Sequence, residues 1–354
     1  MYSINIDILQ EKLMQFLEDH FSSEVSKRIL EVIMWAELHN KQGQGLLKLL
    51  GSEPLQSIKP TGEFEIVDKT QISSIIKANR QPSFYIAQVA TDLAIEKATR
   101  NGFAAVGANG IHSGTGALGF YAERIAASDL IGIVMARSPA AVAPFNTKTS
   151  LFGTNPLAVG FPSLEQPVVF DMATAATTWY ELVLAKLKGT NLAENMAIDS
   201  LGRPTVDPEE AMDGAILPFD VSHKASGLSM LVEIMGGPFV GASYCDHQAT
   251  DEDWGFVVLA LSPDLLNETM EFKKAVSQLT HRVRQQQLLD CQIARMPGDA
   301  GREHAARILE TGNIEVEGAV VEILSLPISG EAPLEPEDTK YHQECIGRVQ
   351  SLIS

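Results

Sequence analysis

A strand-like run, a glycine-rich loop, a helical stretch and a second strand-like run follow one another between residues 103 and 135. Residues 103–107 and 130–135 are almost continuously apolar, whereas residues 118–127 carry apolar side chains at helical spacing. A strand, a connecting helix and a second strand form the unit from which sheets with helices packed on them are built. This unit constrains the fold more than any other stretch, and it predicts an α/β protein.

The rest of the chain adds elements of both kinds, and no internal repeat or low-complexity segment is visible. Residues 5 to about 50 have helical spacing, interrupted by Gly43 and Gly45. The other predicted helices are residues 84–100, 174–188, 225–235, 264–289, 303–311 and 340–353, and the other predicted strands are residues 64–67, 157–161, 168–170 and 254–261.

Charge and composition exclude several classes of protein. The 354 residues carry a formal net charge of -18, with 45% hydrophobic and 20% charged residues. A nucleic-acid-binding protein needs a basic face, and so does a protein that docks on an anionic membrane. We therefore expect neither nucleic acid nor membrane as a partner. Because the overall field repels anions, an anionic substrate has to be held by a few local cations.

The location of the protein is predicted from what its sequence lacks. We find no basic, apolar leader at the N-terminus and no run of about eighteen apolar residues that would span a membrane. The three cysteines, Cys245, Cys291 and Cys345, are odd in number and widely spaced. This pattern favours free thiols in a reducing compartment. Tyr244-Cys-Asp-His247 lacks further ligands at fixed offsets, so no metal is expected. These features predict a cytoplasmic protein.

Residues 114–119, Gly-Thr-Gly-Ala-Leu-Gly, match the dinucleotide fingerprint G-x-G-x-x-G after a strand and before a helix. In a Rossmann fold, Arg137 at the end of the next strand would then favour NADP by meeting its 2′-phosphate. However, the match lies behind a helical block, and a chain with 27 glycines produces such matches by chance. The alternative is a loop in which glycine permits a turn or a close approach to a ligand.

Five segments in register are more specific than this fingerprint. Together they resemble motifs of the type-2 malate/L-lactate dehydrogenase family, which includes ureidoglycolate dehydrogenases, diketogulonate reductases and piperideine/pyrroline-2-carboxylate reductases. The resemblance covers most of residues 100–315. The segments are residues 151–156 (LFGTNP), 169–174 (VFDMAT), 196–208 (with MAID, GRPT and DP), 223–234 (with HKASGL and VEI) and 296–299 (MPGD).

The resemblance implies an α/β, non-Rossmann mixed-sheet fold with a helical N-terminal region, assembled as a homodimer. It implies a helical N-terminal substrate and dimer region at residues 1–120, joined by residues 305–354, and an NAD(P)-binding region at residues 121–304. NAD or NADP is the implied cofactor. Its implied binding residues are Ser138, Asp171, Met172, Ala173, Thr174, His223, Lys224, Pro297, Gly298 and Asp299.

The substrate end departs from the family pattern. Gly43-Gln44 stands where the family has Ser-His, and glutamine does not titrate, so Gln44 can only form hydrogen bonds there. Lys48 replaces the usual arginine, which suggests a single-point cation for a substrate carboxylate. His112 resembles a second family histidine and is the best acid/base candidate, although the longer spacing here also aligns Gly114 with it. Tyr180-Glu181 replaces Gly-Lys.

These departures suggest the chemistry. A ketone needs a proton on its nascent alkoxide, whereas a protonated imine already carries one and tolerates the loss of the family histidine. We therefore expect NAD(P)H-dependent reduction of a small 2-imino or 2-oxo acid, with His112, Gln44 and Lys48 at the reacting carbon. One alternative is NAD-dependent oxidation of a 2-hydroxy acid of the malate, lactate or ureidoglycolate type. Another is a catalytically silent homologue that binds NAD(P) or a metabolite.

Overall fold

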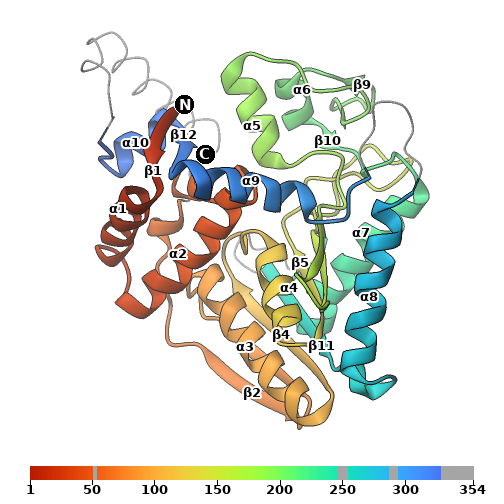
Figure 1. The fold of residues 1–354 in the computed structure, drawn as a ribbon. Helices are drawn as coiled ribbons and strands as arrows, with labels where there is room; N and C mark the ends of the chain where they lie inside the picture. The colour runs from red at the N-terminus through yellow and green to blue at the C-terminus, as the bar shows by residue number, and fades with distance from the viewer. Residues whose placement is uncertain (51–53, 246–253, 287–293, 328–354) are drawn as a thin grey trace.

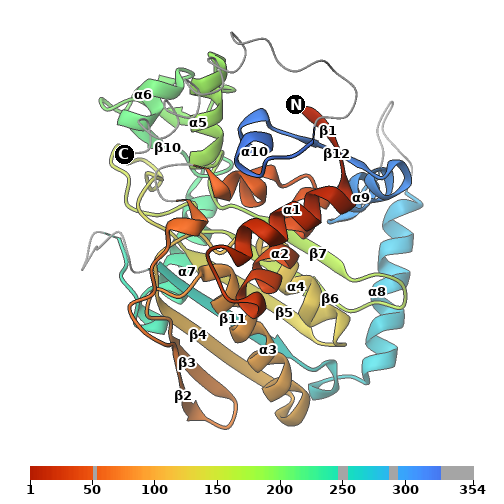
Figure 2. The same ribbon diagram turned by 90° about the vertical axis from the view of Figure 1, so that its left-hand side faces the viewer.

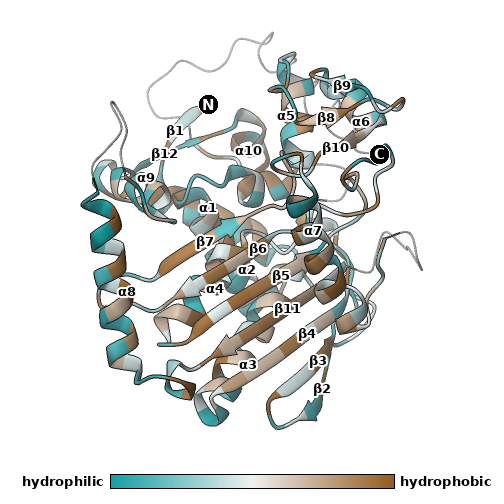
Figure 3. Ribbon diagram, turned by 90° about the vertical axis from the view of Figure 1, so that its right-hand side faces the viewer, coloured by the Kyte–Doolittle hydropathy of each residue, from teal (hydrophilic) through white to brown (hydrophobic). Residues whose placement is uncertain are grey.

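The computed structural model describes residues 1–50, 54–245, 254–286 and 294–327. Its centre is a mixed seven-stranded sheet in the order β2-β3-β4-β11-β5-β6-β7, and apolar residues run along the central strands (Figure 3). The predicted α/β mixed-sheet class is confirmed. The strands are β2 (Glu65–Thr70), β3 (Ser73–Lys77), β4 (Phe103–Ile111), β5 (Ile131–Arg137), β6 (Leu157–Phe161), β7 (Val168–Met172) and β11 (Trp254–Leu261).

The glycine-rich segment after β4 is not a Rossmann phosphate loop. In the sheet, β11 lies between β4 and β5 and is antiparallel to both, so the strands on either side of α4 (Leu118–Ala127) are not neighbours. The Cβ position of Gly119, the last glycine of the match, lies 2.6 Å from the Trp35 ring and 3.0 Å from Asp171 Oδ2. This glycine lets α4 pack closely against its neighbours.

Helices cover the sheet on both faces (Figures 1 and 2). On one face, α3 (Ser83–Asn101) and α4 pack on the strands, and α2 (Ser23–Leu38) packs on both helices. On the other face lies α7 (His223–Gly236). The alternation along β5 shows both layers, because Val134 belongs to the core under α3 and α4 while Met135 packs with Val232 of α7.

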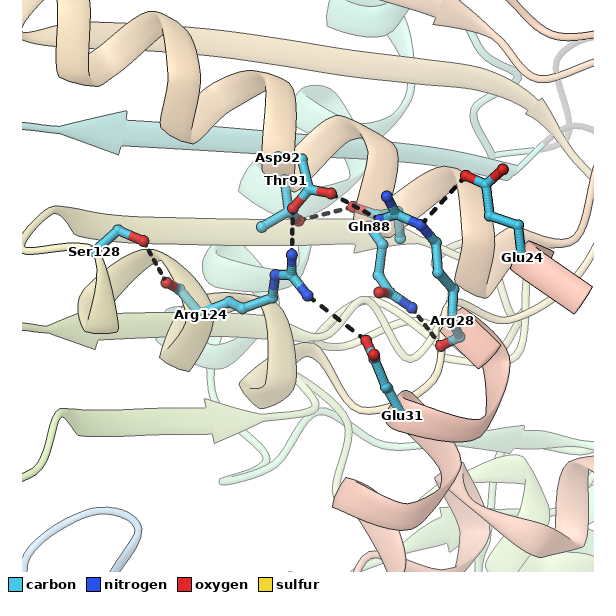
Figure 4. Close-up of polar contacts among 9 residues, drawn as sticks. Glu24, Arg28, Glu31, Gln88, Thr91, Asp92, Arg124 and Ser128 are labelled. Carbon is cyan, nitrogen blue, oxygen red and sulfur yellow. Dashed lines mark hydrogen bonds and ion pairs between the residues drawn. The ribbon is translucent and has the colours of Figure 1, made fainter. Parts of the chain in front are cut away.

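Ion pairs tie the three covering helices together (Figure 4). Asp92 on α3 receives Arg28 of α2 at 2.7 Å and Arg124 of α4 at 2.6 Å, one arginine on each carboxylate oxygen. Arg124 also lies 3.7 Å from Glu31. All four side chains are partly exposed, so this network orients the helices more than it stabilises them.

Two smaller units complete the molecule. At one end, β1 (Tyr2–Asn5) pairs antiparallel with β12 (Asn313–Val316) beside α1 (Ile6–Glu18), α9 (Asp299–Thr311) and α10 (Gly318–Ile323). At the top of Figure 1, a three-stranded sheet has its own core with α5 and α6. Its elements are α5 (Trp179–Lys188), β8 (Ala197–Ile198), β9 (Pro204–Thr205), α6 (Pro208–Asp213) and β10 (Ala215–Ile216).

The predicted elements agree with the structure where the apolar pattern is local. Residues 118–127, 157–161 and 254–261 are found with the predicted bounds. The residues predicted as helical from 5 to about 50 form two helices, α1 and α2, and then short 3-10 turns, and Ser22 caps α2 after residues 19–22. The helix predicted at 174–188 begins only at Trp179, where Thr178 is the cap, and α8 (Thr269–Arg284) is shorter than 264–289. The predicted helix at 340–353, Cys291, Cys345 and His247 lie outside the described residues.

Candidate active site

A cavity of about 400 Å³ opens between β7, the end of α2 and the segment before α9. It brings together three residues that the sequence assigned to the cofactor: Asp171, Pro297 and Gly298. Gly298 adopts φ +87°, a left-handed conformation that favours glycine, and it starts α9. Its remaining walls are Trp35, His39, Asn40, Lys41, Glu123, Val169, Phe170, Arg295, Met296, Ala300, Gly301 and Arg302.

The charged side chains that line this cavity form ion pairs or hydrogen bonds with one another or with neighbouring residues. Lys41 Nζ lies 2.6 Å from Asp171 Oδ2, and the Asp171 side chain is only 10% exposed. Trp35 Nε1 donates to Glu123, and its ring stacks on His39 with centroids 4.0 Å apart. The cavity therefore presents aromatic surface and hydrogen-bonding groups, with its charges already held in place by partners.

The turn before α9 is fixed by Asp299. Its carboxylate accepts hydrogen bonds from Arg284 (2.8 Å), Arg302 (2.7 Å) and the Met296 backbone N–H (2.8 Å). Burial raises the pKa of Asp299, but these hydrogen bonds outweigh burial and bring that pKa to about 2. Asp299 is thus a positioning residue that holds Pro297 and Gly298 at the cavity wall.

Four further predicted cofactor residues lie on the continuation of β7 or opposite it. Thr174 is fully buried and its hydroxyl donates to the backbone oxygens of Thr154 and Asn155. Ser138 Oγ lies 3.4 Å from Thr154 Oγ1, and the Ser138 N–H donates to Asn155 Oδ1. These contacts join Ser138 and the 171–174 segment, with Met172 and Ala173, into one connected strip.

His223 and Lys224 stand apart from this strip. Both side chains are exposed at the start of α7, where Ser222 caps the helix by accepting from the Lys224 and Ala225 N–H groups. Neither is among the described residues that line the cavity. Their predicted cofactor contact stays a prediction.

The three predicted catalytic residues come from two segments. Gln44 lies in the short 3-10 turn η1 (Gln42–Gln44), and Lys48 lies in the next turn, η2 (Leu46–Leu49). His112 directly follows β4 and is only 7% exposed. Lys48 Nζ lies 3.5 Å from the Cβ position of Gly114, two residues after His112, so the structure brings Lys48 and the His112 loop together.

Lys48 differs from the other cations of the site. Burial lowers the pKa of its ammonium from 10.5 to about 8, although the side chain keeps partial access to solvent. Among the described residues, no carboxylate forms an ion pair with it. A cation held among protein atoms in this way is poised to receive an anion from outside the chain.

Sequence reasoning missed two residues beside these turns. The buried carboxylate of Glu37 on α2 accepts from the Leu46 N–H at 2.7 Å, and burial raises its pKa to about 7. The Cβ position of Gly45 would lie 2.2 Å from Glu37 Oε1, so a glycine is needed there. The second residue is Tyr180, whose ring lies 3.3 Å from the Cβ position of Gly43. The replacement at Tyr180-Glu181 was a signal for Tyr180.

A search of the described residues for metal-ligand clusters and for membrane-spanning helices finds neither. Groups of three or more His, Cys, Asp or Glu side chains able to hold a metal are absent from it. In the same residues, the helices are too short or too polar to cross a membrane.

A concave site of this size has the dimensions of a small-molecule binding site. The malate/L-lactate dehydrogenase family profile matches residues 4–325. The chain therefore belongs to the malate/L-lactate dehydrogenase family and is an oxidoreductase.

Individual relatives agree with this assignment. The malate/(S)-sulfolactate dehydrogenase of Methanothermus fervidus is 32% identical over 314 residues, which cover 86% of this chain and 90% of that protein. The L-sulfolactate dehydrogenase of Methanothermobacter thermautotrophicus is 36% identical over 236 residues, covering 64% of this chain and 68% of that protein. The structure of Δ1-piperideine-2-carboxylate reductase from Pseudomonas syringae pv. tomato superposes with a TM-score of 0.80 at 26% identity, covering 92% of this chain and 99% of that one.

Proposed function

We propose that this protein is an NAD(P)H-dependent reductase of a small 2-oxo or 2-imino acid. The observation that carries the proposal is Lys48, a cation without a carboxylate partner among the described residues, which lies beside the His112 loop. A 2-oxo or 2-imino acid carries the carboxylate that such a cation recognises. The relatives support the class, since they include both a malate/sulfolactate dehydrogenase and an imino-acid reductase.

The residues of the cavity fit a nicotinamide dinucleotide. Its volume of about 400 Å³ accommodates one end of such a molecule. Asp171 is an acceptor for ribose or amide groups, and the backbone of Pro297-Gly298 approaches the cavity closely. When bound, the reduced nicotinamide supplies a hydride. The protein orients the acid through Lys48 and Gln44 and provides titrating groups at the reacting carbon.

The choice between NADH and NADPH depends on one arginine. Arg137 is buried and pairs with Glu233 at 3.1 Å, and Lys186 pairs with Glu209 at 2.9 Å, so both are already engaged. Arg302 lines the cavity, although it also binds Asp299. If the coenzyme carries a 2′-phosphate, Arg302 is the residue that meets it, and Arg302→Ala weakens NADPH binding more than NADH binding.

Oxidation of a 2-hydroxy acid is the second candidate, favoured by the dehydrogenase names of two relatives. The two directions share one site and differ in where the proton goes. A preference for oxidation predicts faster turnover at high pH, because a base then has to take the hydroxyl proton.

We further propose that the enzyme is a cytoplasmic homodimer. Met230, Leu231 and Ile234 of α7 are each about half exposed, and Phe239 just beyond the helix is 60% exposed. An apolar helix face of this kind is typical of subunit interfaces. A monomer in analytical ultracentrifugation would contradict the dimer without touching the assigned chemistry.

The test is turnover of NADH and NADPH with a panel of 2-oxo acids, cyclic imino acids and, in reverse, 2-hydroxy acids. We expect reduction of at least one oxo or imino acid and coenzyme binding that raises the melting temperature. His112→Ala should lower kcat on a ketone. Absence of binding of either reduced coenzyme would refute the proposed function.

A further inference from the structure

The cations near the two ends of the site are held differently. Lys41 pairs with Asp171 at 2.6 Å, and Arg302 pairs with Asp299 at 2.7 Å. Lys48 has no carboxylate within 4.0 Å among the described residues. Its Nζ instead lies 3.5 Å from the Cβ position of Gly114, a point that is also 3.6 Å from the Trp254 ring. At the end of the site assigned to substrate, the protein therefore holds an ammonium group that has no carboxylate partner among the described residues.

Few groups at this end can transfer a proton. Gln44 does not titrate, and Tyr180 has its pKa raised by burial and by Glu317 and Glu37, so its hydroxyl stays neutral. The remaining candidates are His112, Lys48 and Glu37, and the Glu37 carboxylate is held by the Leu46 N–H. Burial lowers the pKa of Lys48 to about 8, which keeps it protonated at neutral pH while making it a stronger acid than an exposed lysine.

We infer that Lys48 Nζ is the proton donor to the carbonyl oxygen of the substrate, in addition to binding its carboxylate. This inference rests on the proposed function. The carbonyl carbon receives a hydride from the reduced nicotinamide, the carbonyl π pair moves onto oxygen, and this oxygen takes a proton from Lys48. The products are a 2-hydroxy acid, oxidised coenzyme and a neutral Lys48 amine, which regains its proton from water.

One ammonium group can perform both tasks. In a 2-oxo acid, the carbonyl oxygen and one carboxylate oxygen are on adjacent carbons and can face the same side. Lysine carries three donors on one nitrogen, so Nζ can donate to both oxygens at once. A protonated 2-imino acid needs only the carboxylate contact, because its nitrogen already has the proton.

The ionisable groups around Lys48 come from the elements packed against its turn and from the loop that faces it. The elements packed against η2 are η1, η3 (Leu55–Ser57), α2 and α10. Neither η1 nor η3 carries an ionisable side chain. Glu37 on α2 is bound to the Leu46 N–H, Glu322 lies on α10, and His112 lies in the facing loop. Burial alone, and none of these charges, sets the lowered pKa of Lys48.

Lys48→Arg separates the two tasks, because arginine keeps the positive charge but does not release a proton in proteins. We expect kcat on a 2-oxo acid to fall about 100-fold or more, and the loss of rate above about pH 8 to disappear. On a protonated cyclic imino acid, kcat should fall less than about tenfold, since no donor is needed. Lys77 forms an exposed ion pair with Glu65, and Lys77→Arg is the matched control. It should leave kcat unchanged on both substrates.

A second readout needs no turnover. In the coenzyme-free protein, lysine acetylation is followed by peptide mass spectrometry across pH 6–11, with the other lysines as internal reference. Lys48 should reach half of its maximal reactivity near pH 8, well below the exposed lysines. If Lys48 instead reached half of its maximal reactivity at the same pH as the exposed lysines, the inference would be overturned.

The outcomes separate this inference from the proposed function. If wild type reduces a 2-oxo acid and Lys48→Arg does so within about threefold with an unchanged pH profile, Lys48 only binds the carboxylate and the inference fails. If wild type neither binds reduced coenzyme nor reduces any acid, the proposed function fails first. Coenzyme affinity measured by fluorescence should be the same in Lys48→Arg and wild type.

Discussion

The cavity that we assign to the coenzyme and the turns that we assign to the substrate treat charge in opposite ways. In the cavity, Lys41 and Asp171 are paired, and Asp299 holds two arginines. In the turns, Lys48 has no carboxylate partner among the described residues and Glu37 accepts a single N–H from Leu46. Uncompensated buried charge is costly and persists only where it serves a purpose. The comparison therefore supports our proposal that the reaction takes place at η1, η2 and the His112 loop and that the coenzyme is held in the cavity.

Lys48→Met tests the substrate side most strongly. Because burial lowers the pKa of Lys48 from 10.5 to about 8, its charge destabilises the folded protein at pH 7. The variant should raise the free energy of unfolding at pH 7 by about 3 kcal/mol, while abolishing most turnover.

The unfolded chain binds this proton more tightly than the folded one. Wild-type stability should therefore rise from about pH 8 to about pH 10.5, and the advantage of Lys48→Met should shrink over that range. Urea unfolding at pH 7 and pH 10 measures both effects. A less stable variant at pH 7 would mean that Lys48 has a favourable partner in the fold.

Glu37→Gln gives a similar but smaller effect. Burial raises the pKa of Glu37 from 4.5 to about 7, so the folded state is favoured below pH 4.5 and loses this advantage as pH rises through about 7. The amide can still accept from the Leu46 N–H but adds a donor of its own. We expect a gain of about 2 kcal/mol at pH 8 and none at pH 4. A difference independent of pH would show that Glu37 is not the titrating group.

Asp299→Asn should lower the free energy of unfolding at pH 7, whereas the two preceding variants raise it. The reason is that Asp299 is paired with arginines. Although burial opposes it, hydrogen bonding from Arg284, Met296 and Arg302 lowers the pKa of Asp299 from 3.8 to about 2. The stability that the ionised Asp299 contributes to the folded state is present above pH 3.8 and is lost as pH falls through about 2. Since Arg284 is 41% exposed and screened by solvent, we expect a loss of about 1–2 kcal/mol at pH 7. Coenzyme titration should show weaker binding, and an unchanged melting curve would remove Asp299 from the cavity framework.

Gly43→Ser is expected to have the smallest effect. The added Cβ would lie 3.3 Å from the Tyr180 ring, a tight contact that a small ring movement can relieve. The cost should be below about 1 kcal/mol. In a double-mutant cycle with Tyr180→Leu, a coupling of about 0.5 kcal/mol would show that the two positions share space, and strict additivity would show that they do not.

How far the sequence predicts this molecule depends on the range of each interaction. Residues 157–161 and 118–127 were located to the residue because their apolar pattern is a local signal, as are Pro156 and Pro162 around the strand and Gly116 before the helix. The insertion of β11 between β4 and β5 joins residues more than a hundred positions apart, and no local pattern encodes such pairing.

The site divides in the same way. Motif resemblance placed Asp171, Pro297 and Gly298, which the structure gathers around one cavity. It could not predict the ion pair between Lys41 and Asp171, because the two residues are 130 positions apart in the sequence. Nor could it reveal that Lys48 lies without a carboxylate partner, since burial depends on packing from several elements at once. The helix predicted from residue 174 failed because Thr174 is bound by the 154–155 segment instead.

The pairing of β1 with β12 has a consequence for synthesis. Residues 2–5 leave the ribosome long before their partners at 313–316, which are among the last described residues to be made. At a synthesis rate of roughly 5–20 residues per second, β1 waits on the order of 15–60 s until its partner strand β12 has been made. Until residues 313–316 emerge, this edge stays open to other chains, so a released chain truncated before residue 313 should be far more prone to aggregate than one that includes residue 316.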